Sequence, residues 1–280
     1  RAADAMDVRK LYKFNTRVVS AHYNESANFW EIGLDNGEAL TCRFLISATG
    51  PLSATRMPDI KGIDTFTGES FHSSRWPTES DGTAKCIDFA GKRVGVIGTG
   101  ATGVQIVPIV AESAMELRVF QRTPNWCAPL HNGKISEEEM REIRAGYPEM
   151  FKRCQETFAC FLHTPDPRGT FEVTPEEREA FWEKLYGDKG FGIWQGNFRD
   201  VLVDKRANDM MTEFVVKKIR GRVKDQKVAD KLIPTNHGYG TRRVPLESGY
   251  FEVYNQPNVK LVDIRETPIE RAPARAGVTA

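Results

Sequence analysis

Residues 93–103 read Arg-Val-Gly-Val-Ile-Gly-Thr-Gly-Ala-Thr-Gly, and this stretch decides the fold. Its first five residues form a short apolar run typical of a strand, and residues 102–112 have the pattern of a helix. A second short apolar run, residues 117–121, predicts the next strand. The glycines therefore lie between the first strand and the helix of a β-α-β unit, which indicates an α/β fold.

The glycines of this Gly-x-Gly-x-x-Gly motif have separate tasks. Gly98 makes the turn, Gly100 admits a pyrophosphate, and Gly103 lets the helix pack closely on the strand. The amino end of the helix offers N–H donors and a positive dipole to phosphates. The motif predicts a Rossmann-type dinucleotide site formed by Gly98, Thr99, Gly100, Ala101, Thr102, Gly103 and Gln105. A glycine-rich turn that binds no ligand is the alternative.

The end of the second strand indicates which dinucleotide binds. Units that prefer NAD place Asp or Glu there, about 20 residues after the glycines, to accept the ribose 2′-hydroxyl. This chain instead has Arg122 and Thr123, whose guanidinium and hydroxyl suit a 2′-phosphate, while Glu116 lies at the start of the strand. We expect NADP(H) rather than NAD(H). The alternative is that Arg122 is only a surface charge.

Short β segments are expected on both sides of this unit. Asn36-Gly37 separates two β-rich runs, and this dipeptide is a strong hairpin signal because both residues tolerate positive φ. The apolar residues 44–48 resemble a core strand, and the small residues at 48–50 allow close approach to the backbone. The predicted strands outside the β-α-β unit are residues 17–23, 29–34, 39–46, 251–254 and 259–262.

The remaining segments complete the predicted organisation. Residues 51–91 lack helical periodicity and predict a long ordered loop, whereas residues 134–232 are mostly helical. Capping residues Ser136 and Thr174 begin two of the helices, and a third covers residues 205–219. The predicted domains are 92–245, which binds the dinucleotide and contains the helical insertion at about 134–232, the linker 51–91, and partial segments of another domain at 1–50 and 246–280.

Composition excludes several classes of protein. The 280 residues include 39 Lys plus Arg and 38 Asp plus Glu, and the net charge of +1 argues against a nucleic-acid binder. No apolar run approaches the ~20 residues that span a membrane. The five scattered cysteines indicate neither a disulfide framework nor a metal site, which favours a reducing compartment such as the cytoplasm. Because the chain starts at an arginine, we expect it to be an internal piece of a longer protein or a processed product.

Residues 66–77 read Phe-Thr-Gly-Glu-Ser-Phe-His-Ser-Ser-Arg-Trp-Pro. A single histidine among aromatic residues is, on its own, more often structural than a ligand. The pattern F-x-G-x-x-x-H-x-x-x-W-P nevertheless resembles the signature of the type I Baeyer–Villiger monooxygenases at every specified position. Related flavin N-oxygenases usually lack the Trp-Pro ending. The matching residues are Phe66, Gly68, His72, Trp76 and Pro77.

The resemblance extends over nearly the whole chain. The order of several segments along the chain is similar to that in the family. These segments are Ala48-Thr49-Gly50, the signature, the glycine motif, residues 120–123, the helical insertion and residues 240–243. The last segments look most like the phenylacetone, steroid and cyclopentadecanone monooxygenase subgroup. The resemblance implies a flavoprotein with FAD-binding and NADP-binding domains, which uses NADPH and O2 to insert one oxygen atom into a ketone and form an ester or lactone.

The resemblance also assigns residues. Arg243 aligns with the active-site arginine of the family, which stabilises negative charge on the oxygen intermediate and on the adduct. Arg242 matches a basic position that holds the 2′-phosphate together with Arg122 and Thr123. His72 and Trp76 match positions in a loop that couples the domains.

Two departures limit what the chain is expected to do alone. It has no second Gly-x-Gly-x-x-Gly, so the FAD phosphate site is absent from it, and the family's acidic active-site residue has no counterpart. We therefore expect an inactive fragment. The alternatives are a flavin monooxygenase that oxidises nitrogen or sulfur, and a non-catalytic NADP-binding module. Residues 217–224 are expected to form a solvated basic helix face, and Trp182, Tyr186 and Trp194 to be packing residues.

Overall fold

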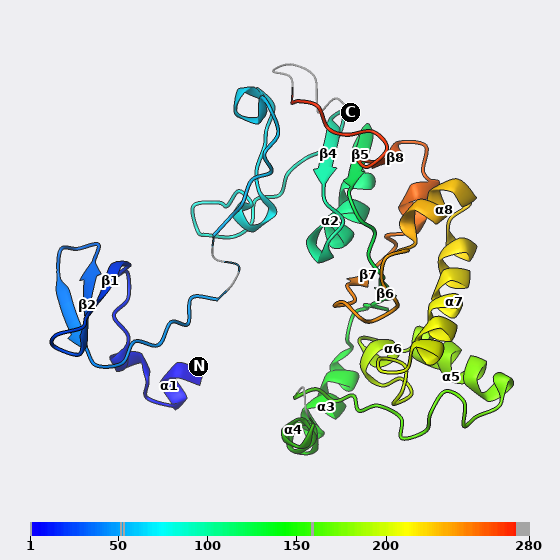
Figure 1. The fold of residues 1–280 in the computed structure, drawn as a ribbon, viewed down its shortest axis with the longest axis horizontal. Helices are drawn as coiled ribbons and strands as arrows, with labels where there is room; N and C mark the ends of the chain where they lie inside the picture. Colours follow the sequence, from blue (N-terminus) through cyan, green and yellow to red (C-terminus); the bar gives the residue numbers. More distant parts are fainter. Residues whose placement is uncertain (1, 51, 53, 158–159, 273–280) are drawn as a thin grey trace. The chain divides into compact units, whose positions relative to one another are not determined.

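The computed structural model describes residues 2–50, 52, 54–157 and 160–272. Its contacts divide the chain into two compact units, Arg1–Arg56 and Met57–Ala280, each of which is described by itself (Figure 1).

The first unit is built around an antiparallel sheet of order β1-β2-β3. The turn between β2 and β3 is the predicted hairpin, with Gly37 at a φ of 82° and Leu34 N–H donating to Glu38 O at 2.9 Å. Its elements are α1 (Ala2–Ala5), the short 3-10 helix η1 (Arg9–Leu11), β1 (Val18–Asn24), β2 (Phe29–Leu34) and β3 (Ala39–Cys42).

The predicted extension of the third strand through residue 46, and the core strand at 44–48, are wrong. β3 ends where Cys42 pairs with Trp30, and β2 begins one residue before Trp30, at Phe29, so residues 44–48 have no partner in this sheet. Phe44 and Ile46 are 85% and 88% exposed.

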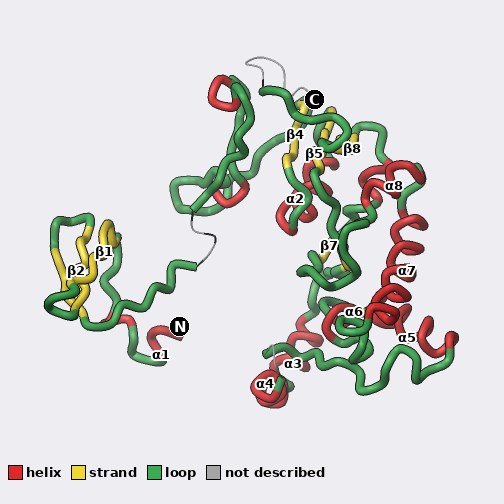
Figure 2. The backbone as a smooth tube through the Cα atoms, in the orientation of Figure 1, coloured by secondary structure: helices red, strands yellow, loops and turns green. Residues whose placement is uncertain are grey.

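The second unit begins with a long ordered segment that contains only short elements, as expected from its sequence. Figure 2 shows it mainly as loop. Its regular parts are η2 (Ile63–Thr65), η3 (Ser73–Arg75) and an isolated bridge between Thr78 and Ala84.

A parallel sheet of order β4-β5-β8 forms the centre of the second unit, and the predicted β-α-β unit is confirmed. The register places Ile97 opposite Phe120, so both strands end at the same edge. Helix α2 buries Val104, Val107 and Val110, whose spacing of three places them on one face. The elements are β4 (Arg93–Ile97), α2 (Ala101–Ala111), β5 (Glu116–Gln121) and β8 (Val259–Asp263).

Helices dominate the segment between β5 and β8, again as predicted. Both predicted caps form: the side chains of Ser136 and Thr174 accept bonds from the backbone N–H of Glu139 and Glu177. The elements are β6 (Ala128–Pro129), α3 (Glu137–Ala145), α4 (Tyr147–Glu156), α5 (Pro175–Gly187), α6 (Gly192–Gln195), α7 (Lys205–Arg222), α8 (Gln226–Leu232), β7 (Leu246–Glu247) and the 3-10 helix η4 (Glu252–Asn255).

The predicted strand at residues 251–254 is wrong, because η4 occupies that place. Gly249 has a φ of 78°, which turns the chain, and Val253 N–H donates back to Gly249 O at 3.2 Å. These local bonds replace the pairing that a strand would need.

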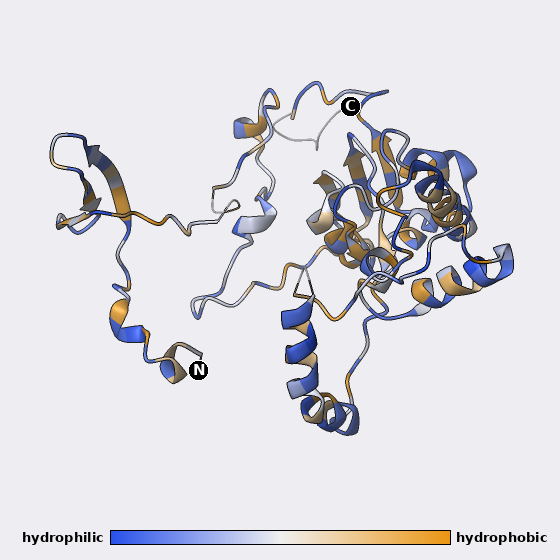
Figure 3. Cartoon of the chain, turned by 60° about the horizontal axis from the view of Figure 1, so that its bottom comes forward, coloured by the Kyte–Doolittle hydropathy of each residue, from blue (hydrophilic) through white to orange (hydrophobic). Residues whose placement is uncertain are grey.

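A hydrophobic core joins the sheet to the helices, and Figure 3 shows hydrophobic residues concentrated there. Trp182 is buried, and Tyr186 and Trp194 pack against the core, as predicted. The prediction of a solvated basic face at residues 217–224 is wrong for Arg222. Its guanidinium donates to Glu247, whose side chain is fully buried, at 2.7 Å, and to Glu252 at 2.5 and 2.8 Å.

Candidate functional site

The glycine loop, residues 98–103, connects β4 to α2. Gly98 has a φ of 103°, a conformation that favours glycine, and its N–H donates to Phe120 O at 2.9 Å. A Cβ atom on Gly103 would lie 2.3 Å from the carbonyl oxygen of Gly98. Gly100 is the N-cap residue of α2, and a Cβ there would meet nothing within 4 Å. The loop thus has an open position at Gly100 next to the free N–H groups of a helix.

Thr99 ties the glycine loop to the end of β5. Its side chain is buried, and Oγ1 donates to the carbonyl oxygen of Thr123 at 3.1 Å. Thr99 therefore acts on the shape of the site. Ala101, Thr102 and Gln105 lie in the first turns of α2, and Thr102 and Gln105 are exposed at a spacing of three on one face.

The residues after β5 carry the predicted specificity group. Arg122 is exposed and Thr123 is partly buried, so both side chains are available at this edge of the sheet. Gln121, in contrast, is fully buried and donates from Nε2 to Lys231 O at 2.7 Å. β5 thus ends in the buried side chain of Gln121, and the next residue, Arg122, is exposed.

The arginine loop, residues 236–243, lies against the segment that follows β5. Trp126 Nε1 donates to His237 O at 3.0 Å, and Asn125 Nδ2 donates to Arg243 O at 3.4 Å. The side chains of Arg242 and Arg243 are exposed. Partial burial, and then the nearby charge of Arg242, lower the pKa of His237. Arg242 and His237 therefore lie close enough to interact electrostatically.

Three segments distant in sequence are thereby joined. The Thr99–Thr123 bond connects the glycine loop to the end of β5, and the Asn125–Arg243 bond connects that end to the arginine loop. Both of the last two segments carry exposed arginine side chains, and the amino end of α2 adds its dipole. This combination favours binding of a polyanion such as a dinucleotide phosphate.

The residues that match the signature bond to other residues of the same segment. His72 Nδ1 accepts from Ser74 N–H at 3.1 Å, and Trp76 Nε1 donates to Lys85 O at 2.9 Å. The carbonyl oxygen of Pro77 accepts from Lys85 N–H at 2.8 Å.

The first two signature residues fit each other closely. A Cβ on Gly68 would lie 2.5 Å from the Phe66 ring. An ion pair of 2.7 Å between Glu69 and Lys92 attaches the segment beside the start of β4, whereas the glycine loop follows the end of that strand. The contacts of these signature residues are thus structural ones.

Sequence reasoning missed the side chains that hold the arginine loop. Asn125, Trp126, Trp194 and Asn208 all donate to its backbone carbonyls. They are separated from their acceptors by 31 to 118 residues, and no local motif surrounds them. Only homologous sequences or a structure could have found them.

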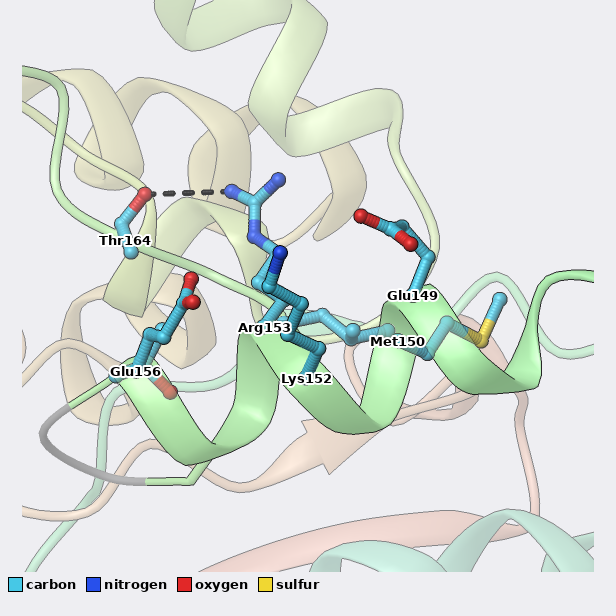
Figure 4. Close-up of a pocket in the computed structure, with 8 residues that line it drawn as sticks. Glu149, Met150, Lys152, Arg153, Glu156 and Thr164 are labelled. Atoms are coloured by element: carbon cyan, nitrogen blue, oxygen red, sulfur yellow. Dashed lines mark hydrogen bonds between the residues drawn. The ribbon is translucent and has the colours of Figure 1, made fainter.

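A separate cavity of about 650 Å³ lies along α4 (Figure 4). Its lining mixes acidic and basic side chains, and Arg153 donates to Thr164 Oγ1 at 3.3 Å across it. None of the predicted site residues lines this cavity. Within the described residues, no cluster of His, Cys, Asp and Glu could hold a metal ion, and none of the helices combines the length and apolar character of a membrane span.

None of the sequence models of known protein families matches the chain. It is, however, 61% identical over 270 residues to 2-oxo-Delta(3)-4,5,5-trimethylcyclopentenylacetyl-CoA monooxygenase of Pseudomonas putida, covering 96% of this chain and 50% of the relative. It is 37% identical over 268 residues to the Baeyer-Villiger monooxygenase of Pseudooceanicola batsensis, with coverages of 95% and 48%. The phenazine N-monooxygenase PhzNO1 of Lysobacter antibioticus is 34% identical over 277 residues, with coverages of 99% and 50%.

Solved structures agree. A crystal structure of OTEMO with FAD and NADP is 59% identical, with a TM-score of 0.94 over 100% of this chain and 52% of that one. A steroid monooxygenase bound to NADP is 41% identical, with a TM-score of 0.87 over 99% and 51%. The chain thus has an α/β fold that matches part of these structures, and it spans about half the length of the curated relatives that it matches.

Proposed function

This chain belongs to the type I Baeyer–Villiger monooxygenases over the half of their length that it spans, and we propose that it provides the NADP(H)-binding part of such an enzyme. In this proposal residues 92–245 form the NADP-binding domain, with the helical insertion at about 134–232. Residues 51–91 are the signature linker, and residues 1–50 and 246–280 belong to the FAD domain.

The observation that carries this proposal is the hydrogen bond from Asn125 to Arg243 O, which joins the segment that carries Arg122 to the arginine loop. The residues present fit NADP(H). The open backbone at Gly100 and the amino end of α2 would hold the pyrophosphate. The exposed guanidinium groups of Arg122 and Arg242, with the Thr123 hydroxyl, would hold the 2′-phosphate. A permanently charged, multi-donor group suits a phosphate better than a ribose hydroxyl.

For the whole protein we propose FAD- and NADPH-dependent insertion of one oxygen atom of O2 into a ketone, which yields an ester or lactone. Bound NADPH supplies hydride and bound FAD activates O2. The chain contains a single Gly-x-Gly-x-x-Gly, so its own residues do not form a second site of this kind for FAD. Arg243, exposed at the end of the arginine loop, would stabilise the negative charge that develops on the oxygen atoms of the reacting ketone.

Titrating the 280-residue chain with NADPH and NADH tests the cofactor. Arg122→Ala should weaken NADPH binding by about 10- to 100-fold, since a hydrogen bond to a charged group contributes ~1.5–3 kcal/mol, and should leave NADH binding unchanged. Arg118→Ala is a matched control, because Arg118 is an exposed arginine of β5, the strand that Arg122 follows, and it pairs with Glu116. Equal affinities of the wild-type chain for NADPH and NADH would refute the proposed specificity.

Arg243→Ala in the whole protein tests the ketone reaction. Ester formation should fall by about 10²–10³-fold, the usual effect of losing a group that stabilises an oxyanion, while flavin reduction by NADPH continues. Arg243→Lys keeps the charge but loses the planar fork, so it should restore little activity. Near-normal ester formation by Arg243→Ala would exclude the assigned role.

The 34% identity with a phenazine N-monooxygenase supports a second candidate, oxidation of nitrogen. Trp76-Pro77 favours the ketone reaction, because the related N-oxygenases usually lack this pair. Supplying the whole protein with a ketone or an aromatic amine and identifying the product separates the two reactions.

A further inference from the structure

The arginine loop is fixed from outside by hydrogen bonds to its backbone. Four of its carbonyl oxygens accept from side chains elsewhere in the chain: Arg243 O from Asn125, His237 O from Trp126 at 3.0 Å, Tyr239 O from Asn208 at 2.7 Å and Gly240 O from Trp194 at 3.1 Å. Two of these donors belong to the helical insertion, Trp194 to α6 and Asn208 to α7. The insertion therefore contacts the loop that carries Arg242 and Arg243.

Asn208 is the centre of these contacts. It is only 7% exposed, and its Nδ2 donates both to Tyr239 O at 2.7 Å and to Val201 O at 2.9 Å. One turn further along α7, Thr212 Oγ1 accepts from Tyr239 N–H at 3.1 Å. The same hydroxyl donates to Asn208 Oδ1 at 3.5 Å. Both backbone groups of Tyr239 are thus held by side chains of α7.

The loop also lies directly against these side chains. A Cβ on Gly238 would lie 1.9 Å from Asn208 Oδ1. Gly240 has a φ of 76°, and a Cβ there would lie 2.7 Å from Leu202 and 3.0 Å from Trp194. Glycine at these two positions therefore lets the loop reach the insertion. A loop fixed in this way loses little further backbone entropy when its last residues bind a ligand.

We propose that Asn208 is a positioning residue, which fixes the arginine loop through Tyr239 and so sets the place from which the Arg242 and Arg243 side chains extend. The functional part of this inference rests on the proposed NADP(H) site. Asn208 itself is buried and acts through the loop backbone. The helical insertion accordingly contributes to the site, although its own side chains do not carry the charges.

Hydrogen exchange of the 280-residue chain tests the positioning without any nucleotide. Asn208→Leu removes the donor, and Thr212→Val removes the acceptor of Tyr239 N–H with little change in shape. Because a hydrogen bond contributes ~0.5–1.5 kcal/mol, amide exchange in a peptide covering residues 236–245 should become about 2- to 12-fold faster in each variant. If Asn208→Leu fails to fold, Thr212→Val decides the matter.

Asn197→Leu is the matched control. Asn197 is a buried asparagine of the same insertion, whose side chain donates to Ile193 O at 3.0 Å and accepts from Trp182 Nε1 at 2.9 Å. Within the described residues, none of its side-chain hydrogen bonds reaches the arginine loop. This variant should lose stability but leave exchange at residues 236–245 as in the wild type. Unchanged exchange in a folded Asn208→Leu variant or in Thr212→Val, or equal acceleration in Asn197→Leu, overturns the proposal.

The ratio of NADPH to NADH affinity tests the consequence for binding. Partial unfolding lowers both affinities equally and leaves their ratio unchanged, whereas a displaced Arg242 weakens NADPH alone. The ratio should therefore fall about fivefold in Thr212→Val and stay constant in Asn197→Leu. If the wild-type chain does not prefer NADPH, the proposed function fails, and the exchange measurement alone decides the role of Asn208. If the wild type prefers NADPH and Thr212→Val keeps that preference, the positioning role fails.

Discussion

The glycine loop is shaped by residues within a few positions of one another, since Gly98 turns the chain and Gly103 leaves room for its carbonyl oxygen. The arginine loop is shaped by Trp126, Trp194 and Asn208, which are 111, 46 and 31 residues away from the carbonyls they hold. The shape of the first loop therefore depends mainly on its own glycines, and that of the second mainly on side chains distant in the sequence. Variants should affect the two loops in different ways.

The largest effect on stability is expected from the ion pair between Arg222 and Glu247. Arg222 is the last residue of α7, the helix whose first half contacts the arginine loop. Arg222→Ala leaves the buried carboxylate of Glu247 without its cationic partner, and breaking a buried ion pair usually costs ~3–5 kcal/mol. Urea unfolding of the wild type and of Arg222→Ala measures this loss in the free energy of unfolding.

The double variant Arg222→Met with Glu247→Leu serves as its control. It removes both charges and should recover most of the lost free energy of unfolding. A loss below ~1 kcal/mol in Arg222→Ala would show that the helical insertion does not depend on this pair.

The glycine loop should respond locally. Gly103→Ala places a methyl group 2.3 Å from Gly98 O, and such overpacking typically costs ~1–3 kcal/mol even without nucleotide. Gly100→Ala meets no atom within 4 Å, so the free energy of unfolding should change by less than ~0.5 kcal/mol. NADPH binding to Gly100→Ala should nevertheless weaken, because in the proposed site the methyl group would lie where the pyrophosphate approaches. Equal stability losses in the two variants would contradict this distinction.

The smallest expected effect is a dependence of stability on acid pH, which arises from His237 in the arginine loop. Burial and the charge of Arg242 lower the pKa of His237, so the unfolded chain binds its proton more readily than the folded one. Stability from this group is therefore intact above the unfolded pKa near 6.5 and is lost as pH falls through the folded value. The glutamine of His237→Gln cannot titrate. The Tm of this variant relative to that of the wild type should therefore rise as the pH falls from 7.5 to 5.5. A constant Tm difference across this range would be the contrary result.

The same contrast explains how much the sequence could predict. The β-α-β unit, the hairpin at Asn36-Gly37 and the cap at Thr174 depend on neighbouring residues, and they form as expected. Residues 44–48 and 251–254 failed as strands because pairing depends on partners that composition does not reveal. Asn208 is an ordinary residue near the start of a helix in the sequence, and its role depends on a loop 31 residues later.

The most direct test of the account is whether Arg122 and Arg242 act on the same phosphate. Titration calorimetry of the wild-type chain and of the double variant Arg122→Ala with Arg242→Ala should compare 2′,5′-ADP with 5′-AMP, which differ in the 2′-phosphate. The wild type should bind 2′,5′-ADP at least about tenfold more tightly, because charge-assisted hydrogen bonds contribute ~1.5–3 kcal/mol, and the double variant should bind both alike. A preference for 2′,5′-ADP that survives in the double variant would contradict the account.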